Sequence, residues 1–217
     1  VQAYLKYAEK KMAQKADLIV ADNSGIESYI KKAYPVAKTT FIAYGTDLAP
    51  SKLTKNSDEV RSFYQKWGVT EENYYLVVGR FVPENNYETV IREFMTTKTN
   101  RDLVIICNHE GNSYFEELRQ KTGFDKEKRI KFVGTVYNRD LLAYIREHAF
   151  AYIHGHEVGG PNPGLLEALS QTKLNLVLGV DFNRSVARDS SLYWTKAAGN
   201  LADTITKAEG ISEQTAY

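Results

Sequence analysis

The chain has few of the features that assign a protein to a narrow class from composition alone. It contains a single cysteine, Cys107, within the apolar run at residues 103–107. This placement predicts a buried thiol in a reducing compartment and excludes a disulfide within the chain. No apolar run reaches the roughly 18 residues that a membrane-spanning helix needs, and no signal-peptide pattern is present. We therefore expect a cytoplasmic protein.

Charge of neither sign dominates, and two common nucleotide-binding motifs are missing. The 28 Lys and Arg residues nearly balance the 27 Asp and Glu residues, so no nucleic-acid partner is expected. No Gly-x-Gly-x-x-Gly and no Gly-x-x-x-x-Gly-Lys-Ser/Thr occurs, which argues against a dinucleotide oxidoreductase and a P-loop enzyme. His154 and His156 alternate along the chain, but only Glu157 stands near them as a third ligand, so no metal site is expected.

The most informative segment is residues 154–170, which follows a predicted buried strand. Asn162 is typical of a helix N-cap and Pro163 of the first helical position, so a helix is expected to begin here. The positive end of its dipole favours an anion at the carboxyl edge of the sheet. Glu157 and Glu167 could accept hydrogen bonds from hydroxyl groups beside that anion, which suggests a sugar phosphate. An ordinary turn between strand and helix is the alternative.

Strands and helices alternate regularly in the second part of the chain. Short apolar runs predict strands at residues 75–79, 103–107, 130–133, 149–154 and 174–178. Helices are expected to begin near Tyr87, Ser113, Asp140 and Pro163, and a short helix is expected near Ser185. Alternation of this kind predicts an α/β fold with a doubly wound, parallel, Rossmann-like sheet.

The rest of the chain is divided around this unit. The first 50 residues are predicted as helix, strand, helix and strand, which are too few strands to close a sheet, so residues 1–50 are interpreted as the tail of another domain. The polar segment at residues 51–73 is expected to connect the domains, and residues 74–190 to form the main domain. Residues 191–217 are expected to be a carboxyl-terminal tail with one helix. The absence of an initial Met also suggests a piece of a longer protein.

A second cluster of chemistry follows the first strand of the main domain. Gly79 and Arg80 end that strand, so parallel strands would bring them to the same edge as residues 154–170. A guanidinium in this position can pair with a diphosphate through two hydrogen bonds. A salt bridge within the protein is the alternative role for Arg80.

Together the two clusters resemble a known family. Val-Gly-Arg-Phe-Val-Pro-Glu-Asn-Asn at residues 78–86 and Glu-Val-Gly-Gly-Pro-Asn-Pro-Gly-Leu-Leu-Glu-Ala-Leu at residues 157–169 resemble the carboxyl-terminal half of family 4, GT-B-fold glycosyltransferases. The second motif looks most like bacterial rhamnosyltransferases of capsule and cell-wall polysaccharide synthesis. Residues 16–24 and 44–47 are similar to the end of the amino-terminal, acceptor-binding domain, whose earlier units would be missing from this chain.

The resemblance implies retaining transfer of a sugar from a nucleotide-diphosphate donor, without an essential metal, to a saccharide or lipid-linked acceptor. Arg80 matches the family's phosphate-binding arginine, while Asn85 replaces its usual lysine. Glu167 matches the acid expected on the sugar of the nucleotide. The first acid of the family's Glu-x7-Glu pair would fall at Gly159, so Glu157, two residues further out, is expected to face the donor sugar and, with Arg80, to act in catalysis.

The resemblance also implies a set of donor-binding residues. The base is expected near Gly134, Thr135 and Val136, and the diphosphate and donor sugar near residues drawn from both motifs: Gly79, Arg80, Asn85, Gly159, Gly160, Asn162, Pro163, Gly164, Leu165 and Glu167. The donor would be thymidine diphosphate rhamnose. A fragment without its acceptor domain would bind nucleotide and turn over poorly.

Two further readings concern partners and function. The predicted helix at residues 1–15 has a basic face that would contact solvent or, peripherally, the inner face of a membrane; its cations are Lys6, Lys10, Lys11 and Lys15. A non-catalytic module that binds nucleotide sugars, and a GT-B-fold epimerase or phosphorylase, are the alternatives to a transferase.

Overall fold

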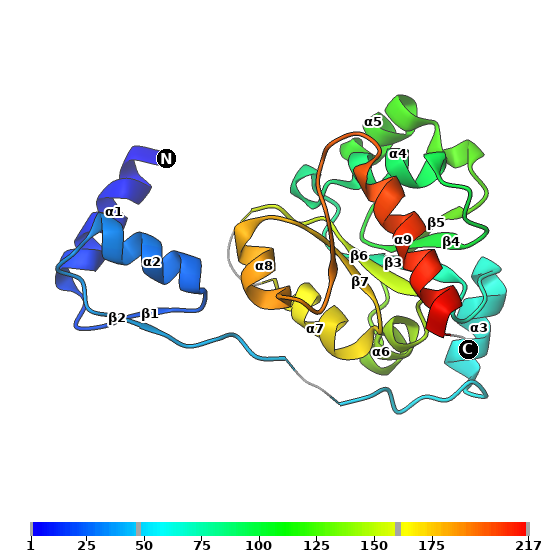
Figure 1. Ribbon diagram of the computed structural model, residues 1–217, viewed down its shortest axis with the longest axis horizontal. Helices are drawn as coiled ribbons and strands as arrows, with labels where there is room; N and C mark the ends of the chain where they lie inside the picture. The colour runs from blue at the N-terminus through cyan, green and yellow to red at the C-terminus, as the bar shows by residue number, and fades with distance from the viewer. Residues whose placement is uncertain (1, 47–48, 159–161, 216–217) are drawn as a thin grey trace.

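The computed structural model describes residues 2–46, 49–158 and 162–215. The first part of the chain forms a small unit from α1 (Gln2–Lys15), β1 (Ile19–Ala21), α2 (Ser24–Ala33) and β2 (Thr39–Phe41). Its two strands are parallel neighbours (Figure 1). Its buried cluster consists of Ala13, Ile19 and Ile30.

The larger unit is a six-stranded sheet with helices on both faces. Its strands are all parallel and lie in the order β5-β4-β3-β6-β7-β8. The elements in chain order are α3 (Asp58–Trp67), β3 (Tyr74–Val78), η1 (Pro83–Asn85), α4 (Tyr87–Thr96), β4 (Asp102–Ile106), α5 (Ser113–Thr122), η2 (Phe124–Lys126), β5 (Ile130–Gly134), α6 (Arg139–Glu147), β6 (Ala151–His154), α7 (Pro163–Gln171), β7 (Asn175–Leu178), α8 (Asp181–Ala187), β8 (Leu192–Trp194) and α9 (Asn200–Thr215).

Local capping sets where several helices begin and end. An asparagine side chain accepts a hydrogen bond from a first-turn N–H of α2, α5, α6 and α7; these caps are Asn23, Asn112, Asn138 and Asn162. Gly68 and Gly123 end α3 and α5 with φ of 60° and 66°, a left-handed conformation that favours glycine. The helix starts predicted at Tyr87, Ser113 and Pro163 are confirmed.

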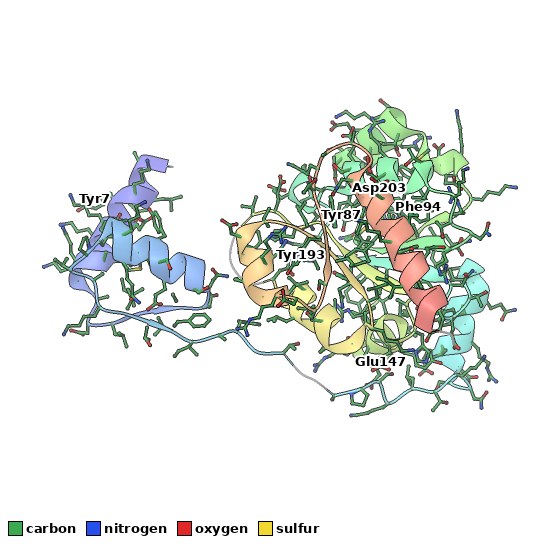
Figure 2. All side chains as sticks on the ribbon, in the orientation of Figure 1. Tyr7, Tyr87, Phe94, Glu147, Tyr193 and Asp203 are labelled. Carbon is green, nitrogen blue, oxygen red and sulfur yellow. The ribbon has the colours of Figure 1, made fainter. Side chains whose placement is uncertain are left out.

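Successive side chains of a strand point to opposite faces of the sheet. Helices cover both faces, so both sets of side chains are buried. On one face Tyr75 and Val77 pack with residues of α4, α5 and α9; Tyr87 and Phe94 of α4 lie in this layer (Figure 2). On the other face Tyr74 and Leu76 pack with residues of α3, α6 and α7. The predicted α/β fold with a doubly wound parallel sheet is confirmed.

The end of the chain differs from the expected tail. No strand is predicted after residue 178, yet β8 pairs with β7, and the Trp194 indole N–H donates to the Leu176 carbonyl at 3.3 Å. Trp194 is fully buried, and α9 covers the sheet with Leu201 and Ile205 (Figure 1). A strand of three residues is too short to show a periodic pattern of apolar side chains. Its position in the sheet depends instead on the burial of Trp194. Residues 191–215 therefore continue the sheet unit.

None of the helices within the described residues has the length and apolar character needed to cross a lipid bilayer.

Candidate functional site

The sheet reverses its winding between β3 and β6. From β3 the chain proceeds outward through β4 and β5, whereas β6, β7 and β8 proceed in the other direction. The loops that follow β3 and β6 therefore border a crevice at the carboxyl ends of the strands, the usual ligand position in such sheets. A cavity of about 380 Å³ lies there, and seven of the predicted residues line it: Gly79, Arg80, Asn85, Asn162, Pro163, Gly164 and Glu167.

Hydrogen bonds fasten the two loops together. The Asn86 side-chain amide donates to the Gly155 carbonyl at 2.8 Å, and the Glu157 N–H donates to the Glu84 carbonyl at 3.1 Å. The backbones approach so closely that a Cβ on Gly155 would lie 2.3 Å from the Asn85 carbonyl oxygen. Only glycine fits at this crossing, so the two loops form one preorganised wall of the cavity.

A chain of contacts organises the polar groups of that wall. The Asn85 amide donates to the Arg80 carbonyl at 2.6 Å, which leaves its Oδ1 as the acceptor for His156 Nδ1 at 2.7 Å. His156 therefore carries its proton on Nδ1. Burial, with the nearby positive charge of Arg80, lowers the pKa of His156. Arg80 is exposed and forms no salt bridge with the residues that the structure describes.

The start of α7 provides less free hydrogen-bonding capacity than its sequence suggests. Asn162 Oδ1 accepts from the Gly164 N–H at 2.9 Å, and the Leu165 N–H donates to the Asn162 carbonyl at 2.9 Å. These two amides are therefore already bonded to Asn162, and the contribution of α7 to an anion would come from the helix dipole. The Leu165 side chain is 1% exposed and packs with Val177 and Ala187, so it supports the helix rather than a ligand.

The acidic side chains of the second motif have different surroundings. Glu167 lines the cavity, and its Oε2 accepts a hydrogen bond from Nη2 of the buried Arg146 at 2.6 Å. Glu157 lies outside the lining, because its carboxylate is bonded to the Lys196 ammonium at 2.6 Å. The hydrogen bond from Lys196 also lowers the pKa of Glu157.

The residues expected around the base stand on the same edge of the sheet. Gly134 ends β5, two strands away from β3, with a left-handed φ of 76°. Val136 packs in the same apolar cluster as Leu142, which lines the cavity, whereas Gly134, Thr135 and Val136 do not line it themselves. Gly159 and Gly160 lie outside the described residues.

Several cavity residues were not predicted as site residues, among them Tyr87, Arg146, Tyr152, His154 and His156. Arg146 could have been found, because it follows Leu142 by four positions and so lies on the apolar face of α6, where a charge is unusual. His154 is 4% exposed, and burial lowers its pKa to about 3. Within the described part of the chain no three His, Cys, Asp or Glu side chains are grouped as a metal site.

Fold and cavity define an α/β unit with a cavity at the switch point of a parallel sheet. Residues 59–214 match the family model described as glycosyl transferases group 1, and residues 1–47 match a domain of unknown function, DUF1972. The first match covers more than half of the chain, so the chain belongs to the group 1 glycosyltransferase family. No curated protein sequence matches it.

Solved structures of low sequence identity share the fold. Anabaena Alr3699/HepE in complex with UDP and glucose is 18% identical with a TM-score of 0.78, and the match covers 100% of this chain and 60% of that one. A glycosyltransferase from Rickettsia africae is 14% identical with a TM-score of 0.75, over 97% of this chain and 57% of that one. Sucrose-phosphate synthase from Thermosynechococcus elongatus is 16% identical with a TM-score of 0.74, and the match covers 97% of this chain and 53% of that one. The chain thus spans little more than half of these proteins.

Proposed function

We propose that the chain carries the donor site of a glycosyltransferase that moves a sugar from a nucleoside diphosphate to an acceptor. The observation that carries this proposal is the cavity at the β3–β6 switch point, which Arg80 lines together with the first residues of α7. Among proteins of similar fold, Alr3699/HepE was solved with UDP and glucose. Family membership and this arrangement of charge support a nucleotide sugar as the ligand.

The chemistry follows from where negative charge develops. As the bond to the sugar breaks, the leaving diphosphate gains charge, and Arg80 with the α7 dipole would stabilise it. By analogy with a lost oxyanion donor, removing such a contact costs about 2.7–4 kcal/mol in the transition state. Glu167 would accept a hydrogen bond from a pentose hydroxyl. Glu157 is not part of this assignment, because Lys196 holds its carboxylate outside the cavity lining.

The finer parts of the proposal rest on the resemblance of the two motifs. They are a retaining, metal-independent reaction, thymidine diphosphate rhamnose as donor, and a saccharide or lipid-linked acceptor of capsule or cell-wall synthesis at the cytoplasmic face of the membrane. In this scheme residues 1–50 belong to the acceptor domain. Residues 51–73, expected to be a connection, include α3, which packs on the sheet of the larger unit, so only the part before α3 would connect the domains. Closure of the cleft between the domains would position the acceptor.

The decisive experiment measures ligand binding by calorimetry. UDP and thymidine diphosphate are titrated into the unaltered chain, Arg80→Gln and the control Arg61→Gln, which changes an exposed arginine on α3. Because a charge-assisted hydrogen bond contributes about 1.5–3 kcal/mol, Arg80→Gln should weaken binding roughly 10-fold to 100-fold. Arg61→Gln should bind as the unaltered chain does. If neither diphosphate binds, or if both variants lose affinity equally, the donor site is not here.

A further inference from the structure

One buried charge beside the cavity has no role in the transfer as described so far. Arg146 of α6 is 4% exposed, and its Nη2 donates to Glu167 Oε2 at 2.6 Å. Burying a guanidinium is costly, and a buried ion pair adds little net stability. A pair of this kind at the wall of a ligand cavity therefore points to control of geometry.

The two ends of the pair differ in their exposure. Both residues line the cavity, but the Arg146 side chain is 5% exposed and that of Glu167 is 40% exposed, so the guanidinium is buried while the carboxylate is partly open. Arg146 Nη1 also donates to Gln171 Oε1 at 3.3 Å, one turn further along α7. One buried side chain of α6 thus holds two positions on the same face of α7.

We propose that Arg146 is a positioning residue that fixes the rotamer of Glu167 and presents its second oxygen, Oε1, to a pentose hydroxyl of the bound nucleotide. Among the described residues no donor bonds to Oε1, whereas Oε2 is held by Arg146. This inference rests on the proposed function. Without Arg146, the Glu167 side chain regains rotational freedom, and the contact with the pentose weakens while the contact of Arg80 with the diphosphate persists.

A purely structural link between α6 and α7 would have a different consequence. Loosening α7 would disturb its amino-terminal end and Pro163 as well as Glu167, all at the same cavity. Every anionic ligand would then lose affinity, whether or not it has a pentose. Comparing a ligand that has a pentose with one that lacks it separates the two roles.

The test uses UDP and inorganic pyrophosphate as probes in calorimetry on the full chain. Arg146→Met should lower the affinity for UDP about tenfold or more and leave the affinity for pyrophosphate unchanged. Arg146→Lys, which keeps the charge, should recover part of the loss. In a Glu167→Gln background, Arg146→Met should cause little additional loss, because the two residues act as a unit.

The outcomes distinguish this inference from the proposal on which it rests. Equal losses for UDP and pyrophosphate in Arg146→Met, or an undiminished loss in the Glu167→Gln background, would overturn the positioning role and leave the donor site standing. Failure of the unaltered chain to bind UDP and thymidine diphosphate would overturn both. Thermal melting of each variant, with Arg61→Met as the control, identifies any variant that fails to fold. If Arg146→Met fails to fold, the affinities of Arg146→Lys for UDP and pyrophosphate decide between the positioning role and the structural role.

Discussion

At the mouth of the cavity a few side chains determine which charges a ligand meets. Arg80 provides the permanent positive charge, and Asn85 stands where the resembling family has a second one. Asn85 instead connects the Arg80 carbonyl to His156, whose pKa is lowered chiefly by burial. Because Arg146, the other arginine that lines the cavity, is paired with Glu167, at neutral pH the diphosphate would meet the charge of Arg80 and the α7 dipole.

The buried histidine behind this wall should make stability depend on pH. Burial lowers the pKa of His154 from 6.5 to about 3, so between these values the unfolded chain binds a proton that the folded chain does not. The free energy of unfolding should therefore decrease as pH falls below 6.5, by up to about 1.4 kcal/mol per pH unit from this residue. Denaturant titrations between pH 5 and 7 measure this slope.

His154→Gln removes the titrating group and should flatten the slope, whatever its effect on stability at pH 7. An equal slope in the variant and the unaltered chain would show that other groups cause the pH dependence.

Among the elements, the loops after β3 and β6 do most to shape the site. They are joined by the bonds from Asn86 to Gly155 and from Glu157 to Glu84, and they cross where Gly155 touches the Asn85 carbonyl. Neither loop is near the other in sequence. Their contact converts two separate motifs into one wall.

Gly155→Ala should separate these loops. Its Cβ would lie 2.3 Å from the Asn85 carbonyl oxygen, so the backbone must shift; we expect a stability loss of about 1–3 kcal/mol, as for an overpacked core, and weaker diphosphate binding. Urea unfolding and calorimetry measure the two effects. The matched control is Gly210→Ala in α9, where the added methyl meets open space and should stabilise by roughly 0.5–1 kcal/mol. If Gly155→Ala behaved like this control, the close crossing would be disproved.

Over the whole molecule, the two units differ in how completely they bury apolar surface. The larger one buries both faces of its sheet. The small unit buries a cluster of three residues and leaves large side chains exposed, such as Tyr7 at 59% (Figure 2). This difference supports the proposal that residues 2–46 belong to the acceptor domain.

Truncation after residue 190 should unfold the larger unit. It removes Trp194, Leu201 and Ile205, each at most 1% exposed, and uncovers the face of the sheet beneath them. Because each such side chain contributes about 1.5–3 kcal/mol, the loss approaches the total stability of a typical domain, about 5–15 kcal/mol. Thermal melting followed by circular dichroism should show no cooperative transition. Truncation after residue 210 retains these side chains and is the control; equal melting of both proteins would mean that residues 191–210 are a tail after all.

Much of the fold could be predicted because its signals are local. Asparagine caps and left-handed glycines mark helix ends within a few residues, and apolar runs mark the strands. β8 could not be predicted, because three residues are too few to show an alternation of apolar and polar side chains. Its position depends on the packing of Trp194 with residues of α9. At the site, the alternation of strands and helices predicted that Gly79, Arg80 and residues 162–167 lie at the same edge of the sheet.

The sequence by itself determined the parallel α/β sheet, the start of α7 and the edge at which the two motifs meet, because these depend on periodicity and capping over a few residues. Only the tertiary structure decided which charges remain available. Lys196 pairs with the carboxylate of Glu157, 39 positions away in the sequence, and Arg146 binds one oxygen of Glu167, 21 positions away. Such pairings arise from packing between distant segments, which no local pattern encodes. Within the described part of the chain they leave Arg80 without a salt bridge and Oε1 of Glu167 without a hydrogen-bond donor, and both residues line the cavity.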